Sequence, residues 1–503
     1  MSLDNYDVIV VGAGNAALCA AISAKEAGAA KVLMLEKAPI DERGGNSLFT
    51  AGGFRFANDG LDDVRRDILD DLSAAEADQI VLPVLKKEDY LDDLRRVTEG
   101  QTDDMLSELL VGRSRDTMRW MRNNRVRFLP MFGRQSFKIG GKHHFYGGVN
   151  VEAVGGGWGL VDQLVKQAER LGIEIRYATG MRRLLQHKSG AVTGVHVMGP
   201  EGYADIAAKS VVLACGGFEA NPEMRVRYYG PGWESCRVRG TRYNTGDGLR
   251  AAMDIDAQAF GGWSTCHAVQ WDISAPPFGD RVVLDNFQKH SYPIGIVVNL
   301  KGERFVDEGA DYRNHTYAKY GREVMKQPQR AAVQIFDAKT IDMLRDEYRI
   351  HQVTKAEAAT IEELAAKLQI DVNGLSRTVR EFNAACQPGK YNPAILDGVT
   401  TAGITPPKSN WALPIDKPPY TGFAVTCGIT FSFGGLRINE HCEVQNTSDR
   451  TIPGLYAAGE MVGGIFYENY LGGAGLMSGA VFGRIAGRSA GGAAIAARWV
   501  CEG

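Results

Sequence analysis

The sequence predicts an α/β protein built around a Rossmann-like, dinucleotide-binding unit. A buried-strand pattern at residues 7–11 breaks into a glycine turn, and a helix and a second strand follow it. Two later apolar runs, at residues 210–215 and 455–457, also end in glycines. Runs of this kind are typical of strands that are buried on both faces. Because a chain of 503 residues is too long for one ordinary domain, we expect two domains.

The composition argues against several classes of protein. A formal charge of −3 and a pI near 6.3 give no support for nucleic-acid binding. The eight cysteines are scattered without a C-x-x-C pair, so the sequence predicts neither a zinc site nor an iron–sulfur cluster. No apolar run is long enough to predict a membrane span. We therefore expect a cytoplasmic protein without a metal site.

The first strand leads into a dinucleotide-binding fingerprint. The glycines allow a tight turn and a close approach of the backbone to a pyrophosphate, and a helix follows over residues 16–27. The second strand, residues 31–36, ends at Glu36, whose carboxylate can accept hydrogen bonds from an adenosine ribose. The expected contacts of the fingerprint are Gly12, Gly14, Asn15 and Ala16.

A second group of small residues follows the ribose site, and it decides which dinucleotide is expected. Nicotinamide enzymes do not need this group, whereas an extended FAD needs its pyrophosphate and its ribityl chain cradled together. We therefore predict FAD as the cofactor. The residues concerned are Lys37, Gly44, Gly45, Asn46, Ser47, Ala51, Gly52 and Gly53.

The middle of the chain alternates between helical and strand patterns. Residues 60–130 place charged and apolar side chains at helical spacing, as on a solvated helical face. A helix is expected at residues 160–171, and strands are expected at 174–177, 184–186 and 192–197.

Further glycine turns are expected to contact the cofactor. One follows the strand at 210–215, another precedes a helix, and a third separates the strand at 455–457 from the closing glycine-rich helix. Free N–H groups at a helix start favour negative charge, such as a reduced isoalloxazine ring carries at its pyrimidine edge. The residues expected at these turns are Gly216, Gly217, Asp247, Gly459, Glu460, Gly475 and Leu476.

These motifs, in this order, resemble those of the fumarate reductase/succinate dehydrogenase flavoprotein superfamily. The resemblance covers essentially the whole chain. It implies a glutathione-reductase-type FAD-binding domain, residues 1–269 and 426–503, with an inserted α+β capping domain at 270–425. Members that bind FAD covalently have a histidine six residues before the paired glycines, where this chain has Asn46. We therefore expect non-covalent FAD.

The resemblance also suggests a catalytic arginine. Fumarate reductases have their proton-carrying arginine four residues after a glutamate, and here Arg313 lies five residues after Glu308, with Tyr312 at four. Arg313 is therefore the expected proton carrier. An ordinary salt bridge from Arg313 to Asp311 or Glu308 is the alternative.

Two departures from fumarate reductases concern the substrate. Phe431 replaces the histidine of their H-T-M-G-G motif, and Tyr470 replaces an arginine before the last glycine pair, so fumarate reduction is disfavoured. The motifs around residues 311–319, 426–436 and 466–470 are similar to the tricarballylate dehydrogenase group. That group desaturates a C–C bond next to a carboxylate and passes electrons to an iron–sulfur membrane partner.

The closing segment also resembles ketosteroid dehydrogenases, in which a tyrosine and a glycine N–H four residues apart hold a ketone oxygen. The matching residues here are Tyr470 and Ala474, next to Gly473. A cyclic ketone is therefore an alternative substrate. Both resemblances imply a small carboxylate or ketone as the substrate.

The sequence thus predicts an FAD-dependent dehydrogenase that acts across a Cα–Cβ bond. Tyr470 would polarise the carbonyl or carboxylate, a base would remove the α-proton, and the hydride would pass to flavin N5. The alternatives are the reverse reaction on an enoate, an electron-transferring subunit that needs a partner, and a non-catalytic flavin module. The predicted bases are Arg313, Tyr467 and Tyr317, with His267 and His315 as further candidate bases. The predicted substrate contacts are His267, Tyr317, Phe431, Gly473 and Ala474.

Overall fold

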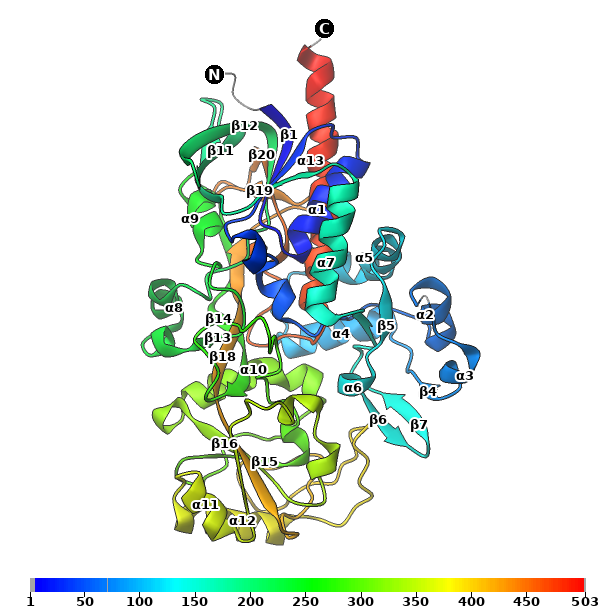
Figure 1. Ribbon diagram of the computed structural model, residues 1–503, viewed down its shortest axis with the longest axis vertical. Coiled ribbons are helices and arrows are strands. Elements are labelled where there is room, and N and C mark those ends of the chain that lie inside the picture. The colour runs from blue at the N-terminus through cyan, green and yellow to red at the C-terminus, as the bar shows by residue number, and fades with distance from the viewer. Residues whose placement is uncertain (1–4, 70, 502–503) are drawn as a thin grey trace.

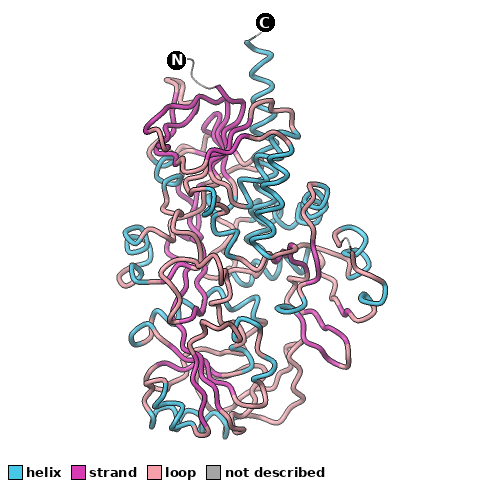
Figure 2. Tube along the Cα trace, viewed as in Figure 1, coloured by secondary structure: helices cyan, strands magenta, loops and turns pink. Residues whose placement is uncertain are grey.

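The computed structural model describes residues 5–69 and 71–501, and these form two sheet-containing halves along one long axis (Figure 1). Figure 2 shows strands gathered at both ends of the molecule, with helices packed beside the upper sheet and below the lower one. The α/β fold expected from the sequence is confirmed. In the described part of the chain, no helix is both long enough and apolar enough to cross a membrane.

The upper half is a parallel sheet with an antiparallel extension. β1 lies between β2 and β12, and its pairing with both strands is parallel. β9 and β20 extend the parallel sheet on either side, while β10 and β11 form an antiparallel meander onto the first part of β12. The strands of this sheet are β1 (Asn5–Val11), β2 (Val32–Leu35), β9 (Glu174–Arg176), β10 (Gly180–Gln186), β11 (Val192–Gly199), β12 (Gly202–Leu213), β19 (Glu443–Gln445) and β20 (Thr451–Ala457).

Helices cover this sheet, and smaller elements flank it. α2 to α5 form the charge-rich helical region expected at residues 60–130. The helices of this half are α1 (Asn15–Glu26), α2 (Leu61–Asp67), α3 (Ala74–Ala77), α4 (Lys87–Val97), α5 (Asp104–Asn123), α6 (Phe132–Gln135), α7 (Gly156–Arg170), α8 (Pro222–Tyr229), α9 (Asp247–Met253) and α13 (Ala474–Cys501). The short strands are β3 (Gly53–Phe54), β4 (Ile80–Val81), β5 (Phe128–Pro130), β6 (Ser136–Ile139), β7 (Lys142–Phe145) and β8 (Val151–Ala153).

The lower half is a capping domain built on a second sheet. Residues 294–308 contribute β15 and one isolated bridge from Val298 to Arg304. The strands of this sheet are β13 (Arg237–Val238), β14 (Ala259–Asp272), β15 (Ile296–Asn299), β16 (Ala332–Phe336), β17 (Lys355–Ala358) and β18 (Tyr420–Leu436), and its helices are α10 (Arg313–Met325), α11 (Ile361–Lys367) and α12 (Val372–Ala385).

Two long antiparallel strands connect the halves. β14 and β18 pair from Ala259 with Leu436 to Asp272 with Val425, and Figure 1 shows β18 running from beside the upper half down to the lower end of the molecule. The expected domain boundaries at 269 and 425 fall within this pair and stay predictions. The ladder is interrupted by register shifts between Gly262 and Cys266 and between His267 and Ala268, and the pairing on either side of them sets which side chains face each other.

The closing helix α13 packs on α1 through a row of glycines. A Cβ atom on Gly483 would overlap the Ala16 carbonyl oxygen, and one on Gly487 would overlap that of Ala20. The two backbones therefore touch, and this contact fixes the start of α1 against the start of α13, where the cofactor contacts are expected.

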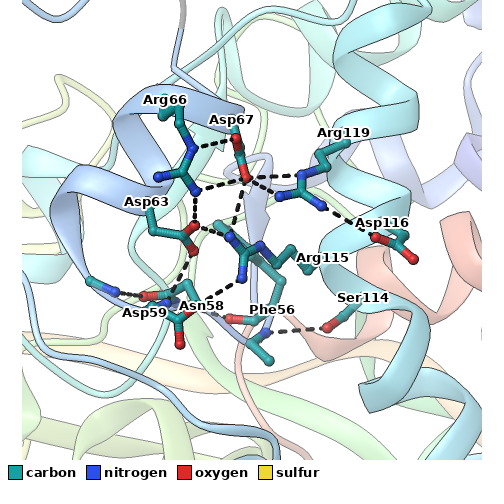
Figure 3. Close-up of polar contacts among 12 residues, drawn as sticks. Phe56, Asn58, Asp59, Asp63, Arg66, Asp67, Ser114, Arg115, Asp116 and Arg119 are labelled. Carbon is teal, nitrogen blue, oxygen red and sulfur yellow. Dashed lines mark hydrogen bonds and ion pairs between the residues drawn. The ribbon is translucent and has the colours of Figure 1, made fainter.

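An ion network ties α2 to α5 at the side of the molecule (Figure 3). Arg115 of α5 contacts Asp59 at 2.9 Å and also pairs with Asp63 and Asp67 of α2. Arg119 pairs with Asp67 as well, and hydrogen bonds from Arg119 and Arg66 lower the pKa of Asp67 against the opposing effect of burial. The network explains why the charged residues of this region are not simply a solvated face.

The glycine row predicts an unequal response to the same substitution along α13. We expect Gly487→Ala to lower the free energy of unfolding by about 1–3 kcal/mol, because the new methyl group must push the helices apart. Gly492→Ala is the matched control, since a Cβ there meets nothing within 4 Å, and we expect it to stabilise by roughly 0.5–1 kcal/mol. Urea unfolding of both variants tests this, and equal stability would contradict the packing argument.

Candidate active site

One continuous cavity lies between the two halves and collects most of the predicted site residues. Its lining comes from the start of α1, the end of β2, the segment at 45–53, the start of α13, and the cap. Most of the predicted cofactor contacts belong to this lining. So do the predicted catalytic residues Arg313 and Tyr470 and the predicted substrate contacts His267, Tyr317, Phe431 and Gly473.

At the cofactor end the wall is poor in side chains. Gly14 precedes α1 without any side-chain cap, so the first N–H groups of that helix face the cavity apart from that of Asn15, which donates to Ser47 Oγ at 3.0 Å. A Cβ on Gly45 would have only the Gly14 Cα nearby, at 3.9 Å. The two glycines therefore lie side by side, and both line the cavity next to the start of α1, where free backbone N–H groups can bind a pyrophosphate.

Glu36 lies at the end of β2, as expected. It is buried, and its Oε1 accepts a hydrogen bond from the Ala38 N–H at 2.8 Å. Burial raises the pKa of Glu36 to about 6 in spite of these backbone donors. Its carboxylate can therefore receive ribose hydroxyls above this pH.

Lys37 and Asp247 form an ion pair of 2.6 Å near the same end. Lys37 also donates to Thr245 Oγ1 at 2.5 Å. Since both charges are satisfied within the protein, the pair connects the β2 end to the α9 start.

Asn46 occupies the position where covalent flavoproteins were expected to have histidine. Its amide donates to Glu219 Oε1 and to the Thr430 carbonyl oxygen, each at 2.6 Å, and it accepts from the Thr241 N–H at 2.9 Å. Glu219 is fully buried, and burial together with the nearby Glu460 raises its pKa well above the usual range. Asn46 is thus a structural link to a protonated carboxyl group.

An aromatic group surrounds the other end of the cavity. The ring of His267 stacks on Phe431 at 5.1 Å and meets the edges of Tyr317 at 4.9 Å and Tyr470 at 4.8 Å. His267 pairs with Phe431 across β14 and β18, which is why the two rings face each other. Burial lowers the pKa of His267 well below its usual value, so its ring is neutral, and neither ring nitrogen has a hydrogen-bond partner within the described residues.

Tyr470 is placed to donate a hydrogen bond into the cavity. Its hydroxyl oxygen accepts from the Gly475 N–H at 3.0 Å, which leaves its proton free, and burial raises its pKa. The Ala474 N–H, expected to complete a ketone clamp, instead donates to the Leu471 carbonyl oxygen at 3.1 Å. One of the two clamp donors is therefore used within the turn.

Arg313 is buried and unpaired. Its alternative partners are occupied, because Asp311 pairs with Arg96 and Glu308 pairs with Arg304 at 2.5 Å. Within the described chain it has no carboxylate partner, and its Nε has no acceptor. Burial, followed by the like charge of Arg345, lowers the pKa of Arg313 to about 10.

Five predicted residues lie outside the lining. Gly52 packs on Gly156, and Gly217 lies against Glu460, so both are needed for close approach of the backbone. Tyr467 is half-buried and lies away from the cavity, near Asp103. The five are Gly44, Gly52, Gly217, Tyr467 and Ala474, and the further candidate base His315 also lies outside the lining.

The structure adds residues that the sequence did not single out. Arg134 forms a two-bond ion pair with Asp285, at 2.5 and 3.1 Å. Glu347 is 1% exposed, and within the described residues neither carboxylate oxygen has a hydrogen-bond partner. No local motif marks these positions, because they come from segments far apart in the chain. The added residues are Arg134, Arg239, His290, Arg345 and Glu347.

Comparisons with known proteins agree with this geometry. The family model described as FAD binding domain matches residues 7–476. The probable fumarate reductase Ifc3 of Shewanella frigidimarina is 30% identical over 494 residues, which is 97% of this chain and 75% of the relative. The 3-oxosteroid 1-dehydrogenase of Mycobacterium tuberculosis (strain ATCC 25618 / H37Rv) is 26% identical over 378 residues, which is 70% of this chain and 66% of the relative.

Among solved structures, the open conformation of a flavocytochrome c3 fumarate reductase is similar to this chain. The TM-score is 0.71 at 28% sequence identity, and the match covers 98% of this chain and 79% of that one.

The position of Glu36 predicts how cofactor binding depends on pH. The ionised carboxylate is the stronger acceptor, so we expect affinity for FAD to fall as pH drops through about 6. Glu36→Gln should weaken binding by roughly 1–3 kcal/mol and remove that pH dependence. Flavin fluorescence titration measures both effects, with Asp41→Asn, an exposed residue nearby, as the control. Unchanged pH dependence in Glu36→Gln would contradict this role.

The presence of Asn46 predicts that the flavin is not covalently attached. Acid or heat denaturation should release intact FAD into the supernatant, and a denaturing gel of the protein should show no flavin fluorescence. Fluorescence that stays with the polypeptide would rule the expectation out.

Proposed function

Because the chain belongs to the succinate dehydrogenase/fumarate reductase flavoprotein superfamily and is an FAD-dependent oxidoreductase of CH–CH groups, we propose that it desaturates a Cα–Cβ bond next to a carboxylate. A tricarboxylate such as tricarballylate is the substrate class that we propose. Arg313 is the proposed proton carrier.

The residues of the cavity fit the cofactor. The cavity wall at Gly14 and Gly45, beside the start of α1, suits the pyrophosphate, and Glu36 suits the adenosine ribose. The start of α13, with Gly475 and Leu476, suits the electron-rich edge of the flavin. FAD, when bound, supplies the acceptor for a hydride from the substrate β-carbon.

The observation that carries the proposal is the set of arginines at the substrate end. Arg313 has no carboxylate partner in the described chain, and its Nε has no acceptor. Arg239 pairs with Asp285 at 3.6 Å, but its Nε has no acceptor either, and Arg345 donates only to carbonyl oxygens and to the Tyr146 hydroxyl. A buried guanidinium without a counterion is costly, and carboxylates are its preferred partners. A substrate with several carboxylates would satisfy this end of the cavity.

Three side chains would divide the work. The free proton of Tyr470 donates to the carboxylate or carbonyl next to the α-carbon, which makes the α-hydrogen more acidic. Arg313, in its neutral form, accepts that proton. His267 is neutral and, with Phe431, excludes water around the reacting carbons. Tyr317 is less suited as the base, because burial raises its pKa well above the usual value.

The reverse reaction, reduction of an enoate, is the second candidate. With a pKa of about 10, Arg313 is almost entirely protonated at neutral pH. A protonated arginine is ready to act as an acid, which the reductive direction needs. The similarity to a probable fumarate reductase also supports this candidate.

A cyclic ketone fits less well. The ketone clamp needs a second backbone donor, and the Ala474 N–H is used by Leu471. A neutral ketone would also leave Arg313 without a carboxylate partner.

We propose an iron–sulfur or membrane protein as the electron acceptor, by analogy with the tricarballylate dehydrogenase group. We also propose a cytoplasmic location, with membrane association through that acceptor. An electron-transferring subunit without its own substrate would not require a buried Arg313 that lacks a carboxylate partner. The same is true of a non-catalytic flavin module.

Anaerobic mixing tests the function directly. Tricarballylate or a related tricarboxylate should bleach the flavin absorbance, whereas simple monocarboxylates and cyclic ketones should not. If only a cyclic ketone bleaches the flavin, the substrate class is a cyclic ketone and not a tricarboxylate. Oxidation of the dithionite-reduced enzyme by an enoate, without bleaching by any saturated acid, would establish the reverse direction.

Arg313→Gln should slow flavin reduction by about 10²–10⁴-fold, because the proton has no acceptor. Lys326→Gln, at the exposed end of the same helix, should leave the rate unchanged. FAD content and the melting temperature serve as checks that both variants are folded. An Arg313→Gln enzyme with the wild-type rate would exclude Arg313 as the proton carrier.

A further inference from the structure

We propose that Arg345 is a positioning residue for Arg313, held against the same carbonyl oxygen so that its like charge keeps the Arg313 guanidinium ready to give up a proton. This inference rests on the proposed function, in which Arg313 carries the proton, and it adds a residue from a separate segment of the cap.

Arg345 is fixed by three hydrogen bonds to its surroundings. Its Nε donates to the Arg134 carbonyl oxygen at 3.1 Å, one terminal nitrogen donates to the His290 carbonyl oxygen at 2.8 Å, and the other donates to the Tyr146 hydroxyl. Arg313 donates to the same Arg134 oxygen at 3.3 Å. Two guanidinium groups therefore converge on one acceptor.

The charge of Arg345 is not neutralised locally. Its neighbour Asp346 pairs instead with the exposed Arg349 at 3.3 Å. The carboxylate of Glu347 is buried, but neither of its oxygens has a hydrogen-bond partner within the described residues. The described chain contains no ion pair to Arg345, and the charge of Arg345 opposes the protonated form of Arg313.

A second, smaller cavity lies on the other side of the two arginines. Arg313 and Arg345 line both cavities. Apart from them and the polar groups of Tyr146 and Ser291, the second cavity is lined by apolar side chains, namely Phe137, Pro293, Ile294, Met343, Pro393 and Trp411. Repulsion between like charges is stronger next to such a wall than in water, because little solvent screens it.

The hydroxyl and imidazole groups that face Arg313 are neutral, and the other charged groups in the lining of the same cavity include Arg134, Arg239 and Glu347. Burial raises the pKa values of Tyr292 and Tyr317, and it lowers that of His290 well below the usual range. Tyr146 presents a hydroxyl that already accepts from Arg345. Arg134, whose carbonyl is shared, has its own guanidinium paired with Asp285. Arg345 is therefore the charged neighbour that sets the acid strength of Arg313, next to burial itself.

The test compares the pH dependence of flavin reduction in Arg345→Gln, Arg345→Lys and the wild type. The pH–rate profile of the wild type should have a limb near pH 10, where Arg313 titrates. Removing the charge of Arg345 should move this limb to higher pH by about one unit, which changes the rate of flavin reduction roughly tenfold at a fixed pH below the limb. The lysine variant keeps the charge and should keep the limb near its wild-type position. The upward direction is the same for desaturation and reduction, because both follow the same Arg313 titration.

Arg349→Gln is the matched control for loosening of the 341–349 segment, since Arg349 bonds within this segment but lies half-exposed outside the cavities. Its limb should coincide with the wild type. Should Arg345→Gln fail to retain FAD, Arg345→Met gives the same comparison with an apolar side chain in the second cavity.

A limb that does not move in the uncharged variant, or that moves equally in the lysine variant, would overturn the role of Arg345. Such a result with an active wild type would leave the proposed function intact. A wild type whose flavin is neither reduced by any acid nor reoxidised by any enoate would instead overturn the proposed function, and this inference with it.

Discussion

The substrate end of this protein is built around a buried guanidinium that has lost its counterions. Asp311 and Glu308 are close to Arg313 in the chain, but Arg96 and Arg304 occupy them. Taking a charged group out of water is costly unless a partner is supplied. Arg313 is the first residue of α10, which packs against β14, and the positive end of the helix dipole at this position adds to the cost. A ligand with carboxylates recovers the lost interaction, so stability is exchanged for affinity at this site.

The long strand pair β14 and β18 makes that exchange possible. Its ladder runs from the cofactor half into the cap, so His267 and Phe431 are set opposite each other by backbone register and not by loop conformation. The α13 helix, locked on α1 by its glycine row, fixes Tyr470 and Gly475 from the other side. The reacting carbons would thus be enclosed by groups carried on rigid elements, as orientation of a substrate requires.

The elements and the cofactor end were predictable from sequence, and the charge arrangement was not. The fingerprint from Gly12 to Glu36 is local, since one strand, one turn and one helix contain it. Arg134, Arg239 and the pair Arg345 and Glu347 come from three separate segments, so only the folded chain shows that they share a cavity. Tyr467 shows the limit of reasoning from proximity in sequence, because it is close to Tyr470 in the chain but does not line the cavity. The backbone turns at Glu468, where φ is +52°, and Tyr467 faces away from the cavity that Tyr470 lines.

The same arginines that would attract a carboxylate also determine how well Arg313 can act as a base, and the two effects oppose each other. An anion bound next to Arg313 favours the protonated guanidinium and raises its pKa, whereas the charge of Arg345 lowers it. Arg239 donates a hydrogen bond to Thr430 of β18. A carboxylate that binds mainly to Arg239 would leave the repulsion between Arg313 and Arg345 in force. A carboxylate that binds to Arg345 would cancel this repulsion and favour the role of Arg313 as an acid. The carboxylates that a substrate presents, and the arginine that each one reaches, therefore bias the direction in which the proton moves.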